Sequence, residues 1–262
     1  GQGSQDRDPP RIGPEQDLED EQRADAQQDG AQNDREREAS AEQPRDRPGE
    51  AAVGDPEQQV ADDENVKKNY PALWKSAANN GTPQTRNMGT VMGNVMRASP
   101  SGDCACALLA LGAKIVFEGP RGKREVSIDD FFIDYKVTAR KADELAVEIK
   151  VPAPKDGVVS AFNRITRTTL DLSKINAAVC LTLANGACKS ARIAMGDVAP
   201  KTISLTDTEE LLKGQKITGS ILDAIAASVA SQINPIDDVR STAEYRREVS
   251  PVLLKRTIAE AI

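Results

Sequence analysis

Residues 87–103 gather the residue types that bind polar organic ligands. They read NMGTVMGNVMRASPSGD, with glycines at 89, 93 and 102 and polar side chains between them. Glycine lets backbone amides approach a ligand that a Cβ would block, and hydroxyl, amide and carboxylate groups can hydrogen-bond a sugar-like chain. The stretch therefore predicts a cofactor-binding loop. A surface turn between two core elements is the alternative that the spacing alone leaves open.

The elements that position this stretch can be predicted from hydrophobic spacing. Residues 71–86 begin with an apolar face and end in turn residues, which is typical of a short helix followed by a turn. The apolar run 105–113 has helical spacing and follows the stretch directly. Residues 114–118 and 124–128 indicate a hairpin, and a third strand is expected over 145–151.

The C-terminal part predicts strands first and helices after them. Strands are expected over 158–165, 175–183 and 188–195, the last two joined by Asn185 and Gly186, a dipeptide suited to a tight hairpin turn. An isoleucine and valine stripe over 217–233 predicts a helix that packs on the sheet. Pro251 is expected to kink or break the closing helix, and Arg246 is expected to face solvent or a partner. This order favours an α+β fold.

The charge is uneven along the 262 residues. Residues 1–66 hold 20 acidic residues and 7 arginines, with no lysine and no aromatic residue. Such a segment cannot bury enough apolar surface to offset its chain entropy. We therefore expect a disordered acidic tail over 1–66, followed by a folded part over 67–153 and a C-terminal domain of antiparallel sheet covered by helices over 154–262.

Several function classes are excluded by composition. The chain has no histidine, which removes Ser-His-Asp and Cys-His catalysis and His-ligated zinc. No nucleic-acid motif is present, and the single tryptophan offers no stacking platform, so nucleic-acid binding is not expected. No catalytic residue and no metal site are predicted, and the four cysteines are expected to be reduced core residues. Without an apolar span or a leader segment, a cytoplasmic protein is expected.

The stretch resembles the second flavin-contacting loop of the FAD-binding (medium) subunit of the molybdenum hydroxylases, the xanthine dehydrogenase and carbon monoxide dehydrogenase type. In that pattern Arg-Asn precedes Gly-Thr, Gly-Gly-Asn follows, and Ser-Pro and an Asp come after. Met92 stands where the first of the two adjacent glycines is usual, and Asn163 where some relatives have lysine. The residues in step with the pattern are Arg86, Asn87, Gly89, Thr90, Gly93, Asn94, Ser99, Pro100 and Asp103.

Further matches to this family follow in the same order along the chain. An acidic-aromatic turn lies at 129–132, a Leu-Asp-Leu at 170–172 precedes a strand at 176–179, ARIAMGDVAP spans 191–200, and a DVRxxAEYRR helix spans 238–247. Four ordered matches are specific, whereas one alone is weak. The family's first flavin half-site, a Gly-Gly-Thr loop, has no counterpart, and the acidic tail occupies its place.

The resemblance implies FAD as the cofactor, with iron–sulfur clusters and molybdopterin only in partner subunits. It also implies that residues 67–153 are the second FAD-binding subdomain. It implies an electron-transfer subunit that takes electrons from an iron–sulfur small subunit, beside a molybdopterin large subunit, and passes them to an acceptor such as NAD. The alternative is a scaffold or truncated subunit that docks these partners without FAD. The cofactor-binding residues implied are Gly89, Thr90, Val91, Met92, Gly93, Asn94, Ser99 and Asp103.

Overall fold

The computed structural model describes residues 50–52 and 56–262, which form antiparallel sheets and helices. This arrangement confirms the predicted α+β class. The strands are β1 (Glu50–Ala52), β2 (Lys114–Gly119), β3 (Gly122–Ser127), β4 (Phe132–Asp134), β5 (Val137–Thr138), β6 (Leu145–Lys150), β7 (Val158–Ile165), β8 (Ile175–Ala184), β9 (Ala187–Gly196) and β10 (Ile203–Ser204). The helices are α2 (Glu57–Asp62), α3 (Glu64–Asn69), α4 (Pro71–Ala78), α5 (Pro83–Met88), α6 (Val91–Arg97), α7 (Asp103–Leu111), α8 (Ile128–Phe131), α9 (Thr206–Leu212), α10 (Gly219–Gln232) and α11 (Ala243–Ala261).

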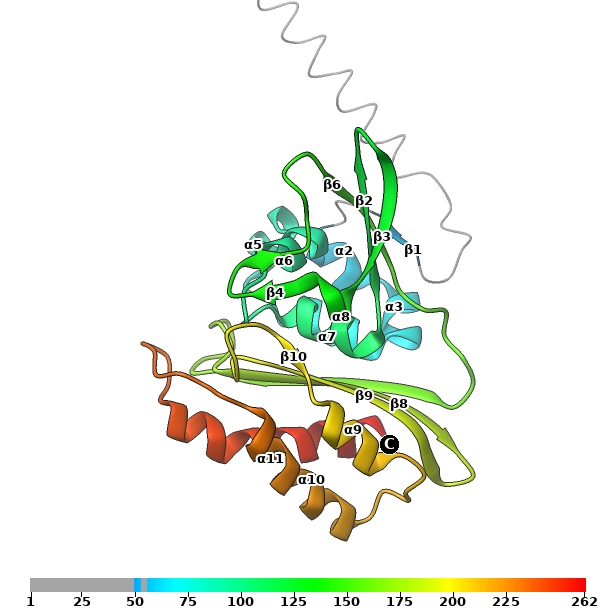
Figure 1. Ribbon diagram of the computed structural model, residues 1–262, viewed down its shortest axis with the longest axis vertical. Coiled ribbons are helices and arrows are strands. Elements are labelled where there is room, and N and C mark those ends of the chain that lie inside the picture. The colour runs from blue at the N-terminus through cyan, green and yellow to red at the C-terminus, as the bar shows by residue number, and fades with distance from the viewer. Residues whose placement is uncertain (1–49, 53–55) are drawn as a thin grey trace, which may run out of the picture. The chain divides into compact units, whose positions relative to one another are not determined.

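The first sheet has the strand order β1-β6-β2-β3, and every neighbouring pair in it is antiparallel. Its hairpin of β2 and β3 follows α7, as the sequence predicts. Gly122 takes a φ of 90°, a left-handed value that favours glycine in the turn between the two strands. A separate pair, β4 and β5, stands beside this sheet (Figure 1).

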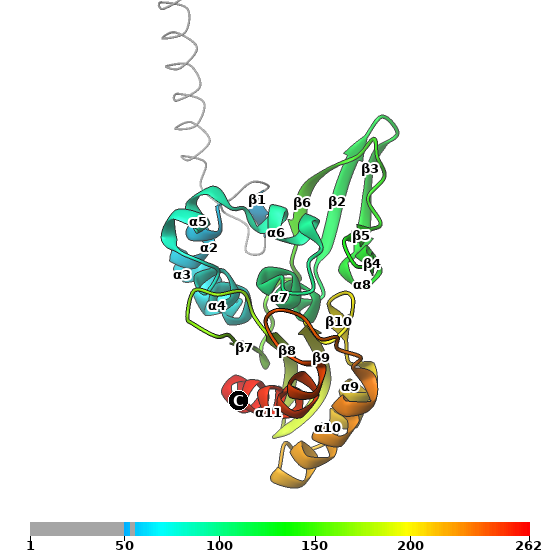
Figure 2. The same cartoon turned by 90° about the vertical axis from the view of Figure 1, so that its left-hand side faces the viewer.

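The second sheet has the order β10-β9-β8-β7 and lies between two groups of helices (Figures 1 and 2). Ala178 of β8 packs in the core that contains α4 and α7, whereas Ala177 and Val179 pack in the core that contains α9, α10 and α11. Successive side chains of a strand point to opposite faces, so both faces of β8 are covered. Its nearly continuous apolar sequence follows from this burial.

The turn between β8 and β9 confirms the predicted hairpin. Asn185 and Gly186 have φ values of 54° and 74°, the two positive values that a type I′ turn requires. Gly112, with a φ of 69°, ends α7 two residues before the predicted end of the apolar run at 113. The Asn185-Gly186 signal is local, which is why the sequence alone locates the hairpin.

The boundary of the predicted tail differs from the structure. Helices α2 and α3 begin before residue 67, and Val60 of α2 is only 2% exposed because it packs in the same core as α4. The Trp74 indole N–H also donates to the Ala61 carbonyl at 2.7 Å. One buried valine and a distant tryptophan thus order a segment whose composition predicts disorder. Residues 1–49 and 53–55 of that tail lie outside the described residues.

One prediction about the closing helix is wrong, and one of the two outcomes predicted for Pro251 does not occur. α11 runs from Ala243 to Ala261 as one helix with Pro251 inside it, so the proline does not break the helix. Arg246, expected at the surface, is 1% exposed, because its guanidinium binds the carbonyl oxygens of Lys174 and Ile236. Backbone carbonyls from two separate segments solvate this charge in place of water.

Candidate cofactor site

The glycine turn, residues 89–94, consists of Gly89 and Thr90, which connect two short helices, and of the first turn of the second helix, α6. The predicted loop over 87–103 is therefore interrupted by a helix from Val91 to Arg97. Gly89 follows the last residue of α5, and Thr90 precedes the first residue of α6. The Thr90 side chain accepts the Gly93 backbone N–H at 2.9 Å, which caps α6. Gly93 is exposed, whereas Val91 and Met92 are buried. The turn therefore presents backbone and small polar groups outward and its apolar side chains inward.

Met92 does not cover the outer face of the turn. Its side chain is 8% exposed and packs in the core with α4 and α7. Gly93 provides the open position instead, because a Cβ there would lie 2.9 Å from Thr90 Oγ1, closer than real Cβ atoms come. The helix cap and the uncovered backbone both depend on glycine at this position.

Residues at the start of helix α2 bind the start of the glycine turn. The Glu57 backbone N–H donates to the Gly89 carbonyl at 2.9 Å, and Pro56 forms an isolated bridge with Thr90. Arg86 Nε donates to Gln58 Oε1 at 2.9 Å. Sequence reasoning missed these supports, because the segment that supplies them was assigned to the tail.

The aspartate turn, residues 99–103, is buried where the glycine turn is open. Ser101, Gly102 and Asp103 are all buried, and Asp103 is the first residue of α7. A Cβ on Gly102 would lie 3.1 Å from Asn94 Oδ1 and 3.1 Å from the Ala105 Cβ. The two turns therefore pack against each other at Gly102, where a side chain would require its neighbours to shift.

The Asp103 carboxylate is bound on both oxygens. Arg164 donates to Oδ2 at 2.7 Å, while Asn176 and Ser173 donate to Oδ1 at 2.8 and 3.2 Å. Burial raises the pKa of Asp103, and the Arg164 charge acts in the opposite direction. All three partners come from β7, from β8 and from the loop between them.

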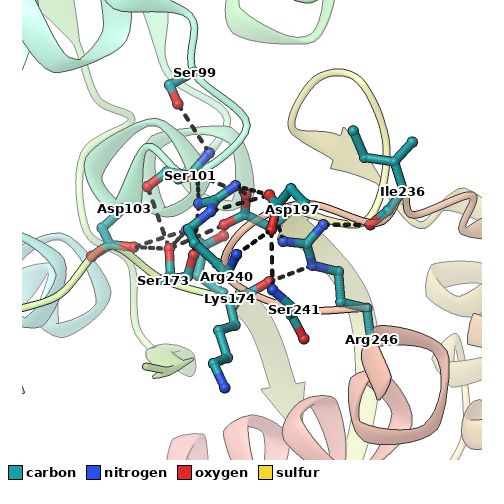
Figure 3. Close-up of polar contacts among 12 residues, drawn as sticks. Ser99, Ser101, Asp103, Ser173, Lys174, Asp197, Ile236, Arg240, Ser241 and Arg246 are labelled. Carbon is teal, nitrogen blue, oxygen red and sulfur yellow. Dashed lines mark hydrogen bonds and ion pairs between the residues drawn. The ribbon is translucent and has the colours of Figure 1, made fainter. Parts of the chain in front are cut away.

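A second buried carboxylate, Asp197, directly follows β9 and binds the same turn (Figure 3). Ser101 Oγ donates to Asp197 at 2.6 Å, and the Asp197 backbone N–H donates to the Pro100 carbonyl at 3.0 Å. Arg240 pairs with Asp197 at 3.0 Å and also donates to Ser101 Oγ. Burial raises the pKa of Asp197 to about 6, although Ser101 and Arg240 lower it.

Asp238 completes this network on the C-terminal side. It pairs with Arg240 at 2.7 Å and with Arg246 at 2.8 Å. Burial raises its pKa, but the bonds from Arg246 and Arg240 outweigh burial and hold the pKa well below its usual range. Asp238 therefore fixes the position of Arg240, and Arg240 binds Ser101 of the aspartate turn.

A polar pocket of about 400 Å³ opens beside Arg164. Its three cations each have a carboxylate partner: Lys75 with Glu260, Arg164 with Asp103, and Arg167 with Asp171. Charge alone therefore does not make it an anion site. Its lining residues are Lys75, Asn79, Asn163, Arg164, Thr166, Arg167, Thr168 and Thr169.

Metal-binding clusters and membrane-spanning helices are absent from residues 50–52 and 56–262. No group of three His, Cys, Asp or Glu side chains in this part of the chain is arranged to hold a metal ion. Cys104 and Cys106 are buried free thiols, and burial raises the pKa of both well above its usual range. No helix described here is long and apolar enough to cross a membrane.

Comparison with known proteins agrees with this organisation of two halves. Residues 56–154 match the family profile described as "FAD binding domain in molybdopterin dehydrogenase". Residues 160–261 match the profile described as "CO dehydrogenase flavoprotein C-terminal domain". The aspartate turn belongs to the first match, and its partners Arg164, Ser173, Asp197 and Arg240 belong to the second.

Curated relatives and a solved structure identify the family. The chain is 32% identical over 195 residues to the glyceraldehyde dehydrogenase medium chain of Sulfolobus acidocaldarius, covering 74% of this chain and 69% of that protein. It is 31% identical over 206 residues to the xanthine dehydrogenase FAD-binding subunit of Escherichia coli O157:H7, covering 78% and 70%. A carbon monoxide dehydrogenase structure from Hydrogenophaga pseudoflava superposes with a TM-score of 0.77 at 29% identity, covering 82% of this chain and 77% of that one. The chain therefore belongs to the FAD-binding medium subunits of the molybdenum hydroxylase family.

Proposed function

We propose that this chain is the flavin-binding electron-transfer subunit of a molybdenum hydroxylase. It takes electrons from an iron–sulfur small subunit, works beside a molybdopterin large subunit, and passes the electrons to an acceptor such as NAD. The observation that carries the proposal is the open face at Gly93, flanked by Thr90 and Asn94, in a turn whose apolar residues Val91 and Met92 are buried. A large polar cofactor can approach this backbone closely.

The residues of the glycine turn fit an FAD edge. Gly89, Thr90, Val91, Met92, Gly93 and Asn94 would hold it through backbone groups and through the Thr90 hydroxyl, and Ser99 lies on the same connection. Asn94 would contribute backbone only, because its Oδ1 is buried. Val91 and Met92 can contribute only backbone groups, because their side chains are in the core. When bound, FAD supplies the electron chemistry, and the protein sets its position and potential.

Asp103 has a different status within the proposed site. Its carboxylate already has three donors, Arg164, Ser173 and Asn176. A cofactor hydroxyl would have to replace one of them or share an oxygen. We therefore propose that Asp103 first fixes the shape of the turn, and that any cofactor contact it makes is additional.

FAD binding to this chain alone is expected to be weak. The chain has the second flavin loop, but Gly-Gly-Thr occurs nowhere in its 262 residues. Each charge-assisted hydrogen bond missing from a diphosphate cradle removes about 1.5–3 kcal/mol. We expect a dissociation constant in the micromolar range or weaker, measured by flavin fluorescence titration. Nanomolar binding would contradict this estimate.

The scaffold function is the second candidate, and the occupied Asp103 carboxylate favours it. In that case the chain docks the iron–sulfur and molybdenum subunits without binding FAD. Purifying the complex through this chain and scoring iron, molybdenum and flavin separates the two functions. Partners with stoichiometric flavin support the electron-transfer subunit, and partners without flavin support the scaffold. Recovery of the chain without either partner counts against both.

A further inference from the structure

Glu57 places a buried carboxylate directly behind the glycine turn. It is the first residue of α2 and is 2% exposed. Its backbone N–H donates to the Gly89 carbonyl at 2.9 Å, and its Oε2 accepts the Asn80 amide at 2.5 Å. The same oxygen would lie 3.5 Å from a Cβ on Gly89. One residue thus contacts both the start of the turn and the loop before α5.

The carboxylate also lies close to Asn94 at the end of the turn. Burial raises the pKa of Glu57, and the neighbouring Asn80 and Asn94 side chains lower it. Asn94 Oδ1 is buried, has no hydrogen-bond partner among the described residues, and would lie 3.1 Å from a Cβ on Gly102. The Asn94 side chain is therefore placed between Glu57 and Gly102.

A buried carboxylate is costly, because its charge loses water. Arg86, whose charge lowers the pKa of Glu57, has its Nε bound to Gln58, while Asp103 acts on Glu57 as a like charge and raises it. An apolar side chain at position 57 would avoid this cost but could not orient the two amides. The presence of a carboxylate at position 57 is thus explained by the asparagine side chains that it positions.

We infer that Glu57 is a positioning residue for the cofactor loop, which it fixes by binding Gly89 through its backbone and by orienting Asn94 through its carboxylate. The inference rests on the proposed function, because the turn that Glu57 holds is the one proposed to contact FAD. Glu57 itself is proposed to touch no cofactor.

The test is Glu57→Gln in the full chain, with Glu64→Gln as the matched control. The substitution keeps the shape of residue 57 but replaces one acceptor oxygen with an amide donor, so only one of the two asparagine amides keeps its acceptor. Glu64 lies on the neighbouring helix with an exposed side chain that pairs with Lys67 at 3.1 Å. Three quantities are measured: amide hydrogen exchange of residues 89–94, the dissociation constant for FAD, and the melting temperature.

For Glu57→Gln we expect exchange of residues 89–94 to be about tenfold faster and FAD binding to be about tenfold weaker. The melting temperature should stay within about 3 °C of the wild type, because one buried charge is removed while one bond is lost. Glu64→Gln should change none of the three. A purely structural role would lower the melting temperature and loosen the whole protein together.

Each other outcome has a defined meaning. Exchange equal to that of the control overturns the inference, and so does faster exchange with unchanged FAD affinity. If the wild type binds no FAD, the proposed function fails, while the exchange result still decides whether Glu57 fixes the turn. If Glu57→Gln does not fold, Asn80→Ala decides, because it removes the amide bound to Glu57. It should speed exchange of residues 89–94 about threefold, and no change overturns the inference.

Discussion

The glycine turn and the aspartate turn belong to one sequence motif, but different forces hold them. The capping bond in the glycine turn joins residues three positions apart, Thr90 and Gly93. The bonds of the aspartate turn reach 61 positions to Arg164 and 96 positions to Asp197. One turn is shaped mainly by local chemistry and is partly exposed, whereas the other is buried and depends on the C-terminal domain.

This difference indicates two roles within the motif, ligand binding and structural support. An open turn can receive a ligand without breaking internal bonds, whereas a turn with every carboxylate oxygen bound is suited to fixing geometry. The second role links the two domains, because Asp197 and Arg240 lie in the C-terminal half and bind Ser101 in the other half. Loss of the C-terminal contacts should therefore affect the aspartate turn first.

The largest expected effect comes from breaking the Arg164–Asp103 pair. Its side chains are 8% and 3% exposed, so Arg164→Ala leaves an unpaired carboxylate in the interior. We expect a loss of about 3–5 kcal/mol in the free energy of unfolding, measured by urea denaturation. Arg167→Ala is the control, because its pair with Asp171 is 76% and 33% exposed and contributes about 0–1 kcal/mol. Equal losses in the two variants would show that the aspartate turn is not held by this pair.

The next largest effect is the pH dependence of stability that Asp197 causes. Its pKa is raised from 3.8 to about 6, so the folded state favours the protonated form. Asp197 makes its full contribution to the free energy of unfolding below pH 3.8. This contribution, about 3 kcal/mol, is lost as the pH rises through 6. Asp197→Asn should remove this pH dependence, since an amide does not titrate and asparagine tolerates the φ of 61° at this position.

Asp238→Asn is the matched control for the pH experiment. The pKa of Asp238 is lowered by its two arginines, so this group stabilises the fold above pH 3.8 and loses that contribution on further acidification. Its substitution should alter the profile below pH 4 and leave the interval from 4 to 6 unchanged. A wild-type free energy of unfolding that is flat across 4 to 6 would contradict the account of Asp197.

The two turns also show what can be predicted from the sequence. Helix α7 and the hairpin of β8 and β9 are predicted by local signals, the apolar run over 105–113 and the pair Asn185-Gly186. The motif locates Gly89 and Thr90 in the same way, although it does not predict that α6 begins at Val91. Such elements depend on residues within a few positions of each other, so spacing suffices.

The partners of the aspartate turn could not be predicted, because tertiary contacts bring them together. Arg164, Ser173 and Asp197 lie in separate segments, and no spacing relates them. One weak signal was available: Asn176 is a polar residue within the apolar strand β8, and it is fully buried. A polar residue in such a strand needs a partner, and Asp103 is that partner at 2.8 Å.

Helix α2 was missed for a related reason. Its segment is polar, and a single valine at position 60 gives no helical stripe. The helix is ordered by the core around α4 and by the Trp74 bond, neither of which a composition argument includes. Disorder predicted from composition therefore fails at the edge of a domain, where a few contacts suffice.

A smaller effect is expected from the cap of the glycine turn. Thr90→Ala removes the side chain that caps α6 and should cost about 1 kcal/mol, measured by thermal unfolding. Thr218→Ala is the control, since Thr218 has the same position before α10 but makes no capping bond to it in the described structure. A Thr90→Ala effect as large as that of Arg164→Ala would remove the distinction between a locally and a globally held turn.

The smallest effect on stability, and the most specific effect on function, is expected from Gly93→Ala. Alanine favours the helical conformation by up to about 1 kcal/mol, but its methyl lies 2.9 Å from Thr90 Oγ1, so the two contributions should nearly cancel in the free energy of unfolding. The methyl also covers the one open backbone position of the turn. FAD binding should therefore weaken about tenfold while stability is unchanged.

Gly219→Ala separates this effect from helix propensity. Gly219 begins α10, and a Cβ there meets no described atom within 4 Å, so the substitution should stabilise the protein slightly and leave FAD binding unchanged. If Gly93→Ala binds FAD as the wild type does, the open face at Gly93 does not contact the cofactor. The cofactor contacts would then have to be made by the aspartate turn, where a cofactor must displace Arg164, Ser173 or Asn176 from Asp103.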